Sequence, residues 1–121
     1  MTDKTAIRPT LSIPSSGSDT AVERFQNQSL RPILKLQHEI YLLWFSDYSR
    51  RRNPEFDSLP CEKKHLFIDR SIQNDHALKN TLIGMTVGML TPEELDFYLL
   101  ESKACNKRIV AMVAERVKSC V

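Results

Sequence analysis

The sequence predicts an all-α protein, and three observations support this class. No segment alternates apolar and polar residues with the period of two that marks a half-buried strand, and no Asn-Gly or Asp-Gly pair suggests a hairpin. Apolar residues recur instead three and four apart along several segments. Only three glycines occur in 121 residues, and two of them fall inside a helical pattern. We therefore expect four main helices in an antiparallel, bundle-like packing.

The chain divides into a tail and one domain. Residues 1–19 combine Thr, Ser, Pro, Gly and charged residues with scattered aliphatic side chains, so they bury too little apolar surface to offset the entropy of ordering. The sequence predicts a disordered tail there and a single helical domain over residues 20–121. The spacing of Thr20 and Glu23 matches a capping box and indicates a short extra helix before Asn27.

The first long helix is expected over residues 29–52. The hydroxyl of Ser29 can cap its start, and Pro32 then lies in the first turn, where a missing N–H costs nothing. Pro54 disfavours helical geometry in the residue before it, so the helix ends near Arg52.

The remaining helices follow from local start signals. One is expected over about 61–73, and the next opens after Asn74 and carries the apolar stretch LKNTLIGMTVGML. In the stretch TPEE, Thr91 can cap a helix, Pro92 occupies the first helical position and Glu94 closes the capping box. A last helix is therefore expected from there to about residue 118.

Composition limits the classes of partner. Seventeen Lys and Arg stand against fifteen Asp and Glu, and the formal charge of +2 is too near neutrality to attract nucleic acid or a membrane by bulk charge. The longest apolar runs fall short of the roughly 20 residues that span a bilayer. We expect a cytoplasmic location without a membrane partner.

Cysteine and histidine spacing predicts neither a cofactor nor a metal site. Cys61, Cys105 and Cys120 form no C-x-x-C pair and are expected to be reduced thiols. The three histidines lie on three different segments, so they form no His-x-x-x-His pair. We therefore expect no catalytic residues, no metal and no cofactor.

The leading functional hypothesis is a non-enzymatic interaction module that forms a homodimer or docks on another protein. The apolar side of the 29–52 helix covers roughly 200° of arc, and residues 82–90 are apolar almost all round, which exceeds what a small monomer easily buries. Gly84 and Gly88 each lower helix stability by about 1 kcal/mol relative to alanine. Close approach of a second helix, either within the chain or across an interface, would offset this loss. The expected interface residues are Tyr41, Trp44, Phe45, Gly84 and Gly88.

Two alternatives remain open. Gln37 projects into the middle of the apolar arc, and His38 lies at its margin. Gln37 is either a structural amide bonded to another helix, or one polar element of a ligand pocket that includes His38 and Tyr41. The run Arg50, Arg51 and Arg52 is either a solvated helix end or a phosphate contact of a nucleic-acid-binding regulator.

The stretches RFQNQSLRPILKLQHEI, EKK, LIGMTVGMLTPEELDFYL and NKRIVAMVAERVKS together resemble a group of short bacterial proteins that often bear the label glyoxalase. The resemblance covers about residues 23–119. The label denotes a metal-dependent βαβββ enzyme whose ligands lie on strands, and this sequence predicts no strands. The resemblance therefore implies an uncharacterised all-helical group and not glyoxalase activity. No catalytic residue carries over from it.

Overall fold

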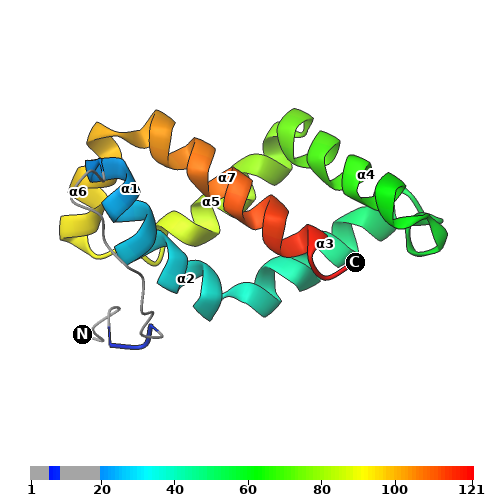
Figure 1. The fold of residues 1–121 in the computed structure, drawn as a ribbon, viewed down its shortest axis with the longest axis horizontal. Coiled ribbons are helices and arrows are strands. Elements are labelled where there is room, and N and C mark those ends of the chain that lie inside the picture. The colour runs from blue at the N-terminus through cyan, green and yellow to red at the C-terminus, as the bar shows by residue number, and fades with distance from the viewer. Residues whose placement is uncertain (1–5, 9–19) are drawn as a thin grey trace.

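The structure, a computed structural model, describes residues 6–8 and 20–121, and every regular element in these residues is helical. The all-α class is thereby confirmed. The elements are α1 (Ala21–Phe25), a π-helical turn (Gln26–Leu30), α2 (Arg31–Leu36), α3 (His38–Arg52), a 3-10 turn (Phe56–Ser58), α4 (Cys61–Asn74), α5 (His76–Val87), α6 (Pro92–Leu100) and α7 (Ser102–Lys118) (Figure 1).

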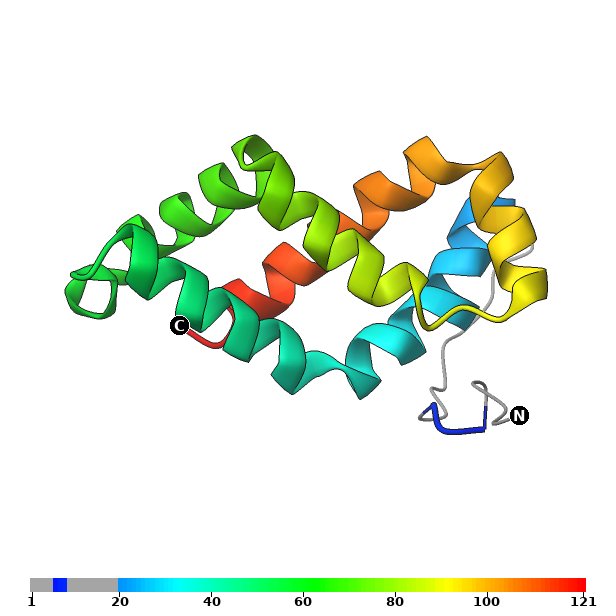
Figure 2. The same ribbon diagram turned by 180° about the vertical axis from the view of Figure 1, so that it is seen from behind.

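The helix α7 occupies the centre of the molecule. It packs against α3, α4, α5 and α6, and α4 and α5 pack against each other (Figures 1 and 2). Buried side chains recur along it at every fourth residue, which places them on one continuous face. These residues are Cys105, Ile109, Val113 and Val117.

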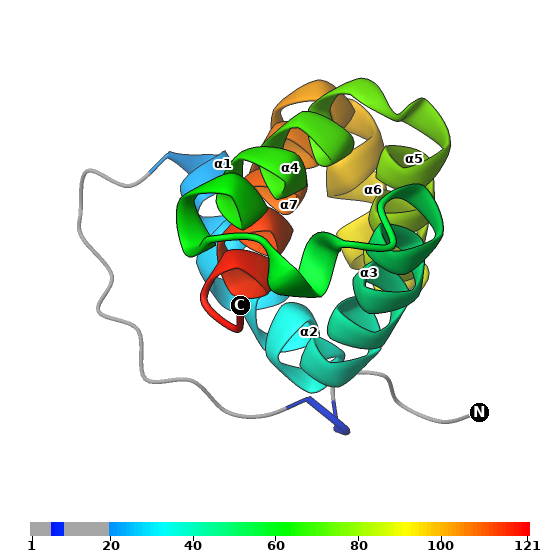
Figure 3. The ribbon, with the colours of Figure 1, turned by 90° about the vertical axis from the view of Figure 1, so that its right-hand side faces the viewer.

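The other helices pack around the buried face of this helix, and its opposite face is exposed. Figure 3 shows α4 and α5 above α2 and α3 when the molecule is viewed along its long axis. At one end α1 meets α6, where the rings of Phe25 and Phe97 lie 4.8 Å apart. At the other end Phe45, Phe56 and Phe67 join α3, the 3-10 turn and α4 through aromatic contacts. Apolar packing thus runs through the whole length of the fold.

Several local start signals form as expected. The Thr91 hydroxyl accepts a hydrogen bond from the Glu94 N–H, and the Glu94 carboxylate accepts one from the Thr91 N–H, which completes the capping box. Thr20 caps α1 by accepting from the Glu23 N–H. Asp75, one residue later than expected, caps α5 by accepting from the Leu78 N–H.

The first expected long helix is not continuous. The chain is helical from Ala21, passes through the π-helical turn, and is interrupted at Gln37, whose φ of −98° and ψ of 12° leave helical geometry. Ser29 lies buried inside the π-helical turn, so its expected role as the cap of this helix is wrong. No Pro or Gly marks the interruption at Gln37.

The last expected helix is also divided in two. Glu101, with φ −124° and ψ 32°, separates α6 from α7. The hydroxyl of Tyr98 on α6 donates a hydrogen bond to the side-chain oxygen Oδ1 of Asn106 on α7, so the two helices remain joined across the bend. Two of the four expected long helices are therefore divided into shorter segments, whereas α4 has nearly its expected bounds.

The expected tail contains one residue that the structure fixes in place. The guanidinium of Arg8 forms two bonds with the Glu94 carboxylate, at 2.8 and 2.7 Å, and a third with the Met89 carbonyl at 2.7 Å. Its side chain is only 6% exposed. Arg8 therefore belongs to the folded unit; residues 1–5 and 9–19 lie outside the described part of the chain.

Candidate functional site

The clearest surface feature is a row of apolar side chains that extends from the end of α2 along α3. We call Leu36, Ile40, Leu43 and Trp44 the apolar stripe. Their exposed fractions are 39%, 51%, 72% and 49%. Because residues three and four apart share a helix face, Ile40, Leu43 and Trp44 lie together on α3 over about 6 Å at the helical rise of about 1.5 Å per residue. Leu36 precedes them at the end of α2, on the other side of the interruption at Gln37.

Two buried rings set the rotation of α3. Tyr41 and Phe45 are 0% and 2% exposed, so both point into the core. The Tyr41 hydroxyl lies 2.7 Å from Thr86 Oγ1, and Thr86 donates in turn to the Leu82 carbonyl at 3.0 Å. Burial raises the pKa of the Tyr41 phenol, which keeps its proton available for this bond.

Tyr41 and Phe45 were expected at an interface, and their burial within the chain removes both from the surface. Trp44 is half exposed and stays available. The helical wheel shows a wide apolar arc but does not show which edge of that arc faces the core. The apolar stripe is the edge left outside once Tyr41 and Phe45 turn inward.

Gln37 is bonded within the chain. Its Nε2 donates to the Met85 carbonyl at 3.0 Å. Met85 lies in the last turn of α5. In a longer helix the Met89 N–H would donate to the Met85 carbonyl, but here it donates to the Thr86 carbonyl. Gln37 therefore satisfies an unpaired carbonyl at a helix end, which matches the structural amide of the first alternative.

His38 lies beside the C-terminal end of the chain. Arg116 Nη1 is 3.3 Å from His38 Nδ1, and Cys120 Sγ is 3.8 Å from His38 Nε2. Since a guanidinium only donates, Nδ1 is the acceptor and a neutral ring carries its proton on Nε2, directed at the thiol. Gln37 and His38 thus point to different partners and do not form one pocket.

Gly84 and Gly88 are exposed and face away from the apolar stripe. A Cβ built on Gly84 meets nothing within 4 Å, so no helix of the described chain approaches it closely. Residues two apart on a helix point in nearly opposite directions, which places Gly84 on the side of α5 opposite Thr86 and Tyr41. The five residues expected at one interface are therefore spread over the core and two separate faces.

The three arginines at the end of α3 each contact an aspartate. Arg50 pairs with Asp57 at 3.5 Å, and Arg51 pairs with Asp47 at 3.0 Å. Arg52 pairs with Asp75 at 3.2 Å. Neighbouring carboxylates weaken the positive potential that a phosphate backbone would need. This arrangement is typical of a solvated helix end.

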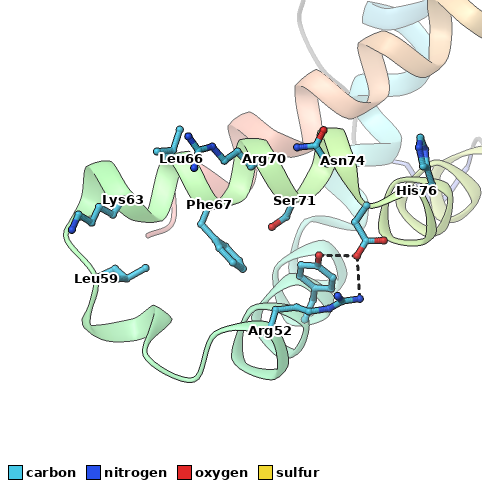
Figure 4. A pocket seen from close by; sticks show the side chains of 11 residues that line it. Arg52, Leu59, Lys63, Leu66, Phe67, Arg70, Ser71, Asn74 and His76 are labelled. Atoms are coloured by element: carbon cyan, nitrogen blue, oxygen red, sulfur yellow. Dashed lines mark hydrogen bonds and ion pairs between the residues drawn. The ribbon is translucent and has the colours of Figure 1, made fainter.

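An open pocket of about 790 Å³ lies between the end of α3 and α4 (Figure 4). Phe67 and Ser71 point into it from α4, and Leu59 closes one end. Tyr48 donates to Asp75 Oδ2 at 2.8 Å, and the Arg52 guanidinium lies 5.3 Å from the centre of the Tyr48 ring. This wall of the pocket joins α3 to the cap of α5, which gives it a structural role.

Two of the three thiols, those of Cys61 and Cys120, lie near imidazoles that the sequence did not predict as their partners. Cys61 Sγ is 3.5 Å from His65 Nε2, and the Cys61–His65 spacing of four residues on one helix is the signal that could have revealed this pair. Cys105 is buried in the core. Among the described residues no group of three or more His, Cys, Asp or Glu side chains is placed to hold a metal ion.

The described part of the chain forms a small all-helical fold with an exposed apolar stripe on α3 and the end of α2. No helix in the described part of the chain combines the length and apolar character needed to cross a membrane. Comparisons with family models, with curated proteins and with solved structures each gave no match. The resemblance to the short bacterial group therefore stays a prediction.

Proposed function

We propose that this protein is a non-enzymatic interaction module that forms a homodimer through the apolar stripe. The observation that carries the proposal is the exposure of Ile40, Leu43 and Trp44 on one face of α3, with Leu36 exposed beside them in sequence at the end of α2. A row of this kind is costly to leave in water, and burial contributes about 1.5–3 kcal/mol for each large apolar side chain that becomes fully covered.

The charges around the stripe favour a second copy as the occupant. Lys35 and Glu39 are exposed beside its N-terminal half, and Asp47 with Arg51 follows its C-terminal end. A surface flanked by both signs does not repel a copy of itself, as a surface of one sign would. In a two-fold dimer the same patch serves both partners, so each stripe residue is buried twice.

The test is the oligomeric state of the full chain and of one charge variant. Leu43 is the most exposed member of the stripe, so Leu43→Glu leaves the core intact and introduces two buried carboxylates per dimer. We expect multi-angle light scattering to give a dimer for the parent chain at a few hundred micromolar. The variant should dissociate at least about a hundredfold more readily, since each copy loses more than about 1.4 kcal/mol.

The matched control is Leu100→Glu on α6, where the side chain is 83% exposed and lies outside the stripe. This variant should remain dimeric. Circular dichroism should report unchanged helix content for both variants. A parent chain that is monomeric at this concentration, or a Leu43→Glu variant that dimerises like the control, would contradict the proposal.

A further inference from the structure

A second surface, separate from the apolar stripe, has the form of a helix-binding groove. It lies between α4, α5 and α7 and encloses about 620 Å³. None of its lining residues belongs to α2 or α3. We call it the lysine groove, after the cations on its rim: Lys79, Lys103, Lys107 and Lys118.

Small and aliphatic side chains form the floor of the lysine groove. Ile72 and Ile83 contribute from α4 and α5, and Val110, Ala111 and Ala114 contribute from α7. The two alanines lack the bulk that would fill the space above the α7 backbone. The groove is therefore hollow because of the sequence of α7, which presents small residues where α4 and α5 diverge.

The charge of the rim is unbalanced. At one end Lys118 Nζ lies 3.2 Å from Asp69 and 3.1 Å from Glu115, so two carboxylates more than offset its charge. Towards the other end Lys79, Lys103 and Lys107 have no acidic side chain within ion-pair distance among residues 6–8 and 20–121. An apolar floor with this uncompensated positive rim suits an occupant that is both apolar and anionic.

The dimensions of the lysine groove favour a helix over a small molecule. Lys103 and Lys118 lie fifteen residues apart on α7, which corresponds to about 22 Å of helical rise, or about four turns. Grooves between helices bind amphipathic helices through apolar anchors three, four and seven residues apart. A small-molecule pocket would instead surround most of its ligand.

Nucleic acid fits the lysine groove less well. Its lining includes the carboxylates of Asp69 and Glu115, and it contains no aromatic side chain on which a base could stack. We propose that the lysine groove binds an acidic amphipathic helix of a protein partner, with the apolar face on the alanine floor and the carboxylates on Lys79, Lys103 and Lys107. This proposal does not rest on self-association, because the two surfaces share no residue.

The test measures fluorescence anisotropy with a labelled synthetic helix of about sixteen residues that carries leucines along one face and glutamates beside them. Two further probes replace the glutamates with lysines or scramble the leucine positions at constant composition. We expect saturable binding of the acidic probe with a Kd of about 10–100 μM. We expect much weaker binding of the other two probes.

Charge reversal locates the binding. The double variant Lys103→Glu with Lys107→Glu should raise the Kd of the acidic probe at least about tenfold and should bind the lysine probe more tightly instead. Ala111→Phe, which fills the floor without a change of charge, should also weaken it. The matched control is Lys63→Glu with Arg70→Glu, which alters net charge equally but lines the other pocket and should change the Kd less than about threefold.

Circular dichroism on each variant separates loss of binding from loss of fold. Absence of saturable binding at about 0.5 mM probe would overturn the proposal, since a specific docking site binds more tightly than this. Equal losses of affinity in the two double variants would show only general electrostatic attraction and would overturn the proposal as well. So would binding of the scrambled probe that equals binding of the acidic probe. Light scattering on the same samples reports independently on the dimer.

Discussion

The hydrogen bond between Tyr41 and Thr86 holds α3 against α5. Both side chains are 0% exposed, and the Thr86 hydroxyl also donates to the Leu82 carbonyl. A buried polar pair of this kind fixes the rotation of a helix, because any other rotation would leave a hydroxyl unsatisfied. This bond, together with the burial of the Phe45 ring, holds the apolar stripe on the outer edge of α3.

A double-mutant cycle can measure this bond. Tyr41→Phe removes its donor, and Thr86→Val removes its acceptor with little change of volume. Each single variant should lose about 1–3 kcal/mol of unfolding free energy in urea denaturation, because Tyr41→Phe leaves Thr86 Oγ1 without its donor and Thr86→Val leaves the buried Tyr41 hydroxyl without its acceptor. The double variant should lose about 1 kcal/mol less than the sum of the two single variants. Strictly additive losses would show that the two hydroxyls do not interact.

Gln37 and Tyr41 show how far single residues could be predicted. A polar residue inside an apolar arc signals a buried amide, so the structural alternative for Gln37 was accessible from sequence. Its partner, the Met85 carbonyl, was not accessible, because that bond joins residues 48 positions apart. Tyr41 was misplaced at an interface since apolar character alone does not separate a core face from an exposed one.

The ends of the helices could be predicted, whereas their interruptions could not. The start of α6 could be predicted from the sequence TPEE, because its signals, Thr91, Pro92 and Glu94, all act within one turn of the chain. The interruptions at Gln37 and Glu101 contain neither Pro nor Gly. Each occurs where the next segment packs on a different neighbour, and such packing is a tertiary effect.

The capping box provides a test at this scale. Thr91→Ala removes the acceptor for the Glu94 N–H and should lower the unfolding free energy by about 0.5–2 kcal/mol, measured by urea denaturation. Ser102→Ala, at the start of α7, removes a side chain that caps nothing and should change it by less than about 0.5 kcal/mol. Equal effects of the two changes would contradict the assigned cap.

The pair of Arg8 and Glu94 links distant parts of the whole molecule. Burial raises the pKa of Glu94, but hydrogen bonds from Arg8, Ser29 and the Thr91 backbone outweigh that effect and lower it to about 2. A carboxyl whose pKa falls on folding stabilises the folded state above its unfolded pKa, here 4.5. This stabilisation is lost as the pH falls from 4.5 towards 2.

Arg8→Met tests this linkage. Near neutral pH the variant should lose roughly 1–2 kcal/mol of unfolding free energy, a figure reduced to allow for solvent screening. The difference from the parent chain should shrink as the pH falls below 4.5 and should largely vanish only near pH 2, where Glu94 becomes protonated in the folded state as well. Arg51→Met, in the exposed pair with Asp47, should have a much smaller effect at any pH. A pH-independent loss for Arg8→Met would contradict the assignment.

The sequence by itself determined the all-α class, the caps at Thr20 and Thr91, and the end of α3 before Pro54, because these depend on side-chain periodicity and on contacts within one turn. Only the tertiary structure decided that Tyr41 and Phe45 point inward, that Arg8 binds Glu94, and that small residues on α7 leave the lysine groove open. These features depend on residues far apart in the chain, and a helical pattern contains no information about which neighbour each face will meet.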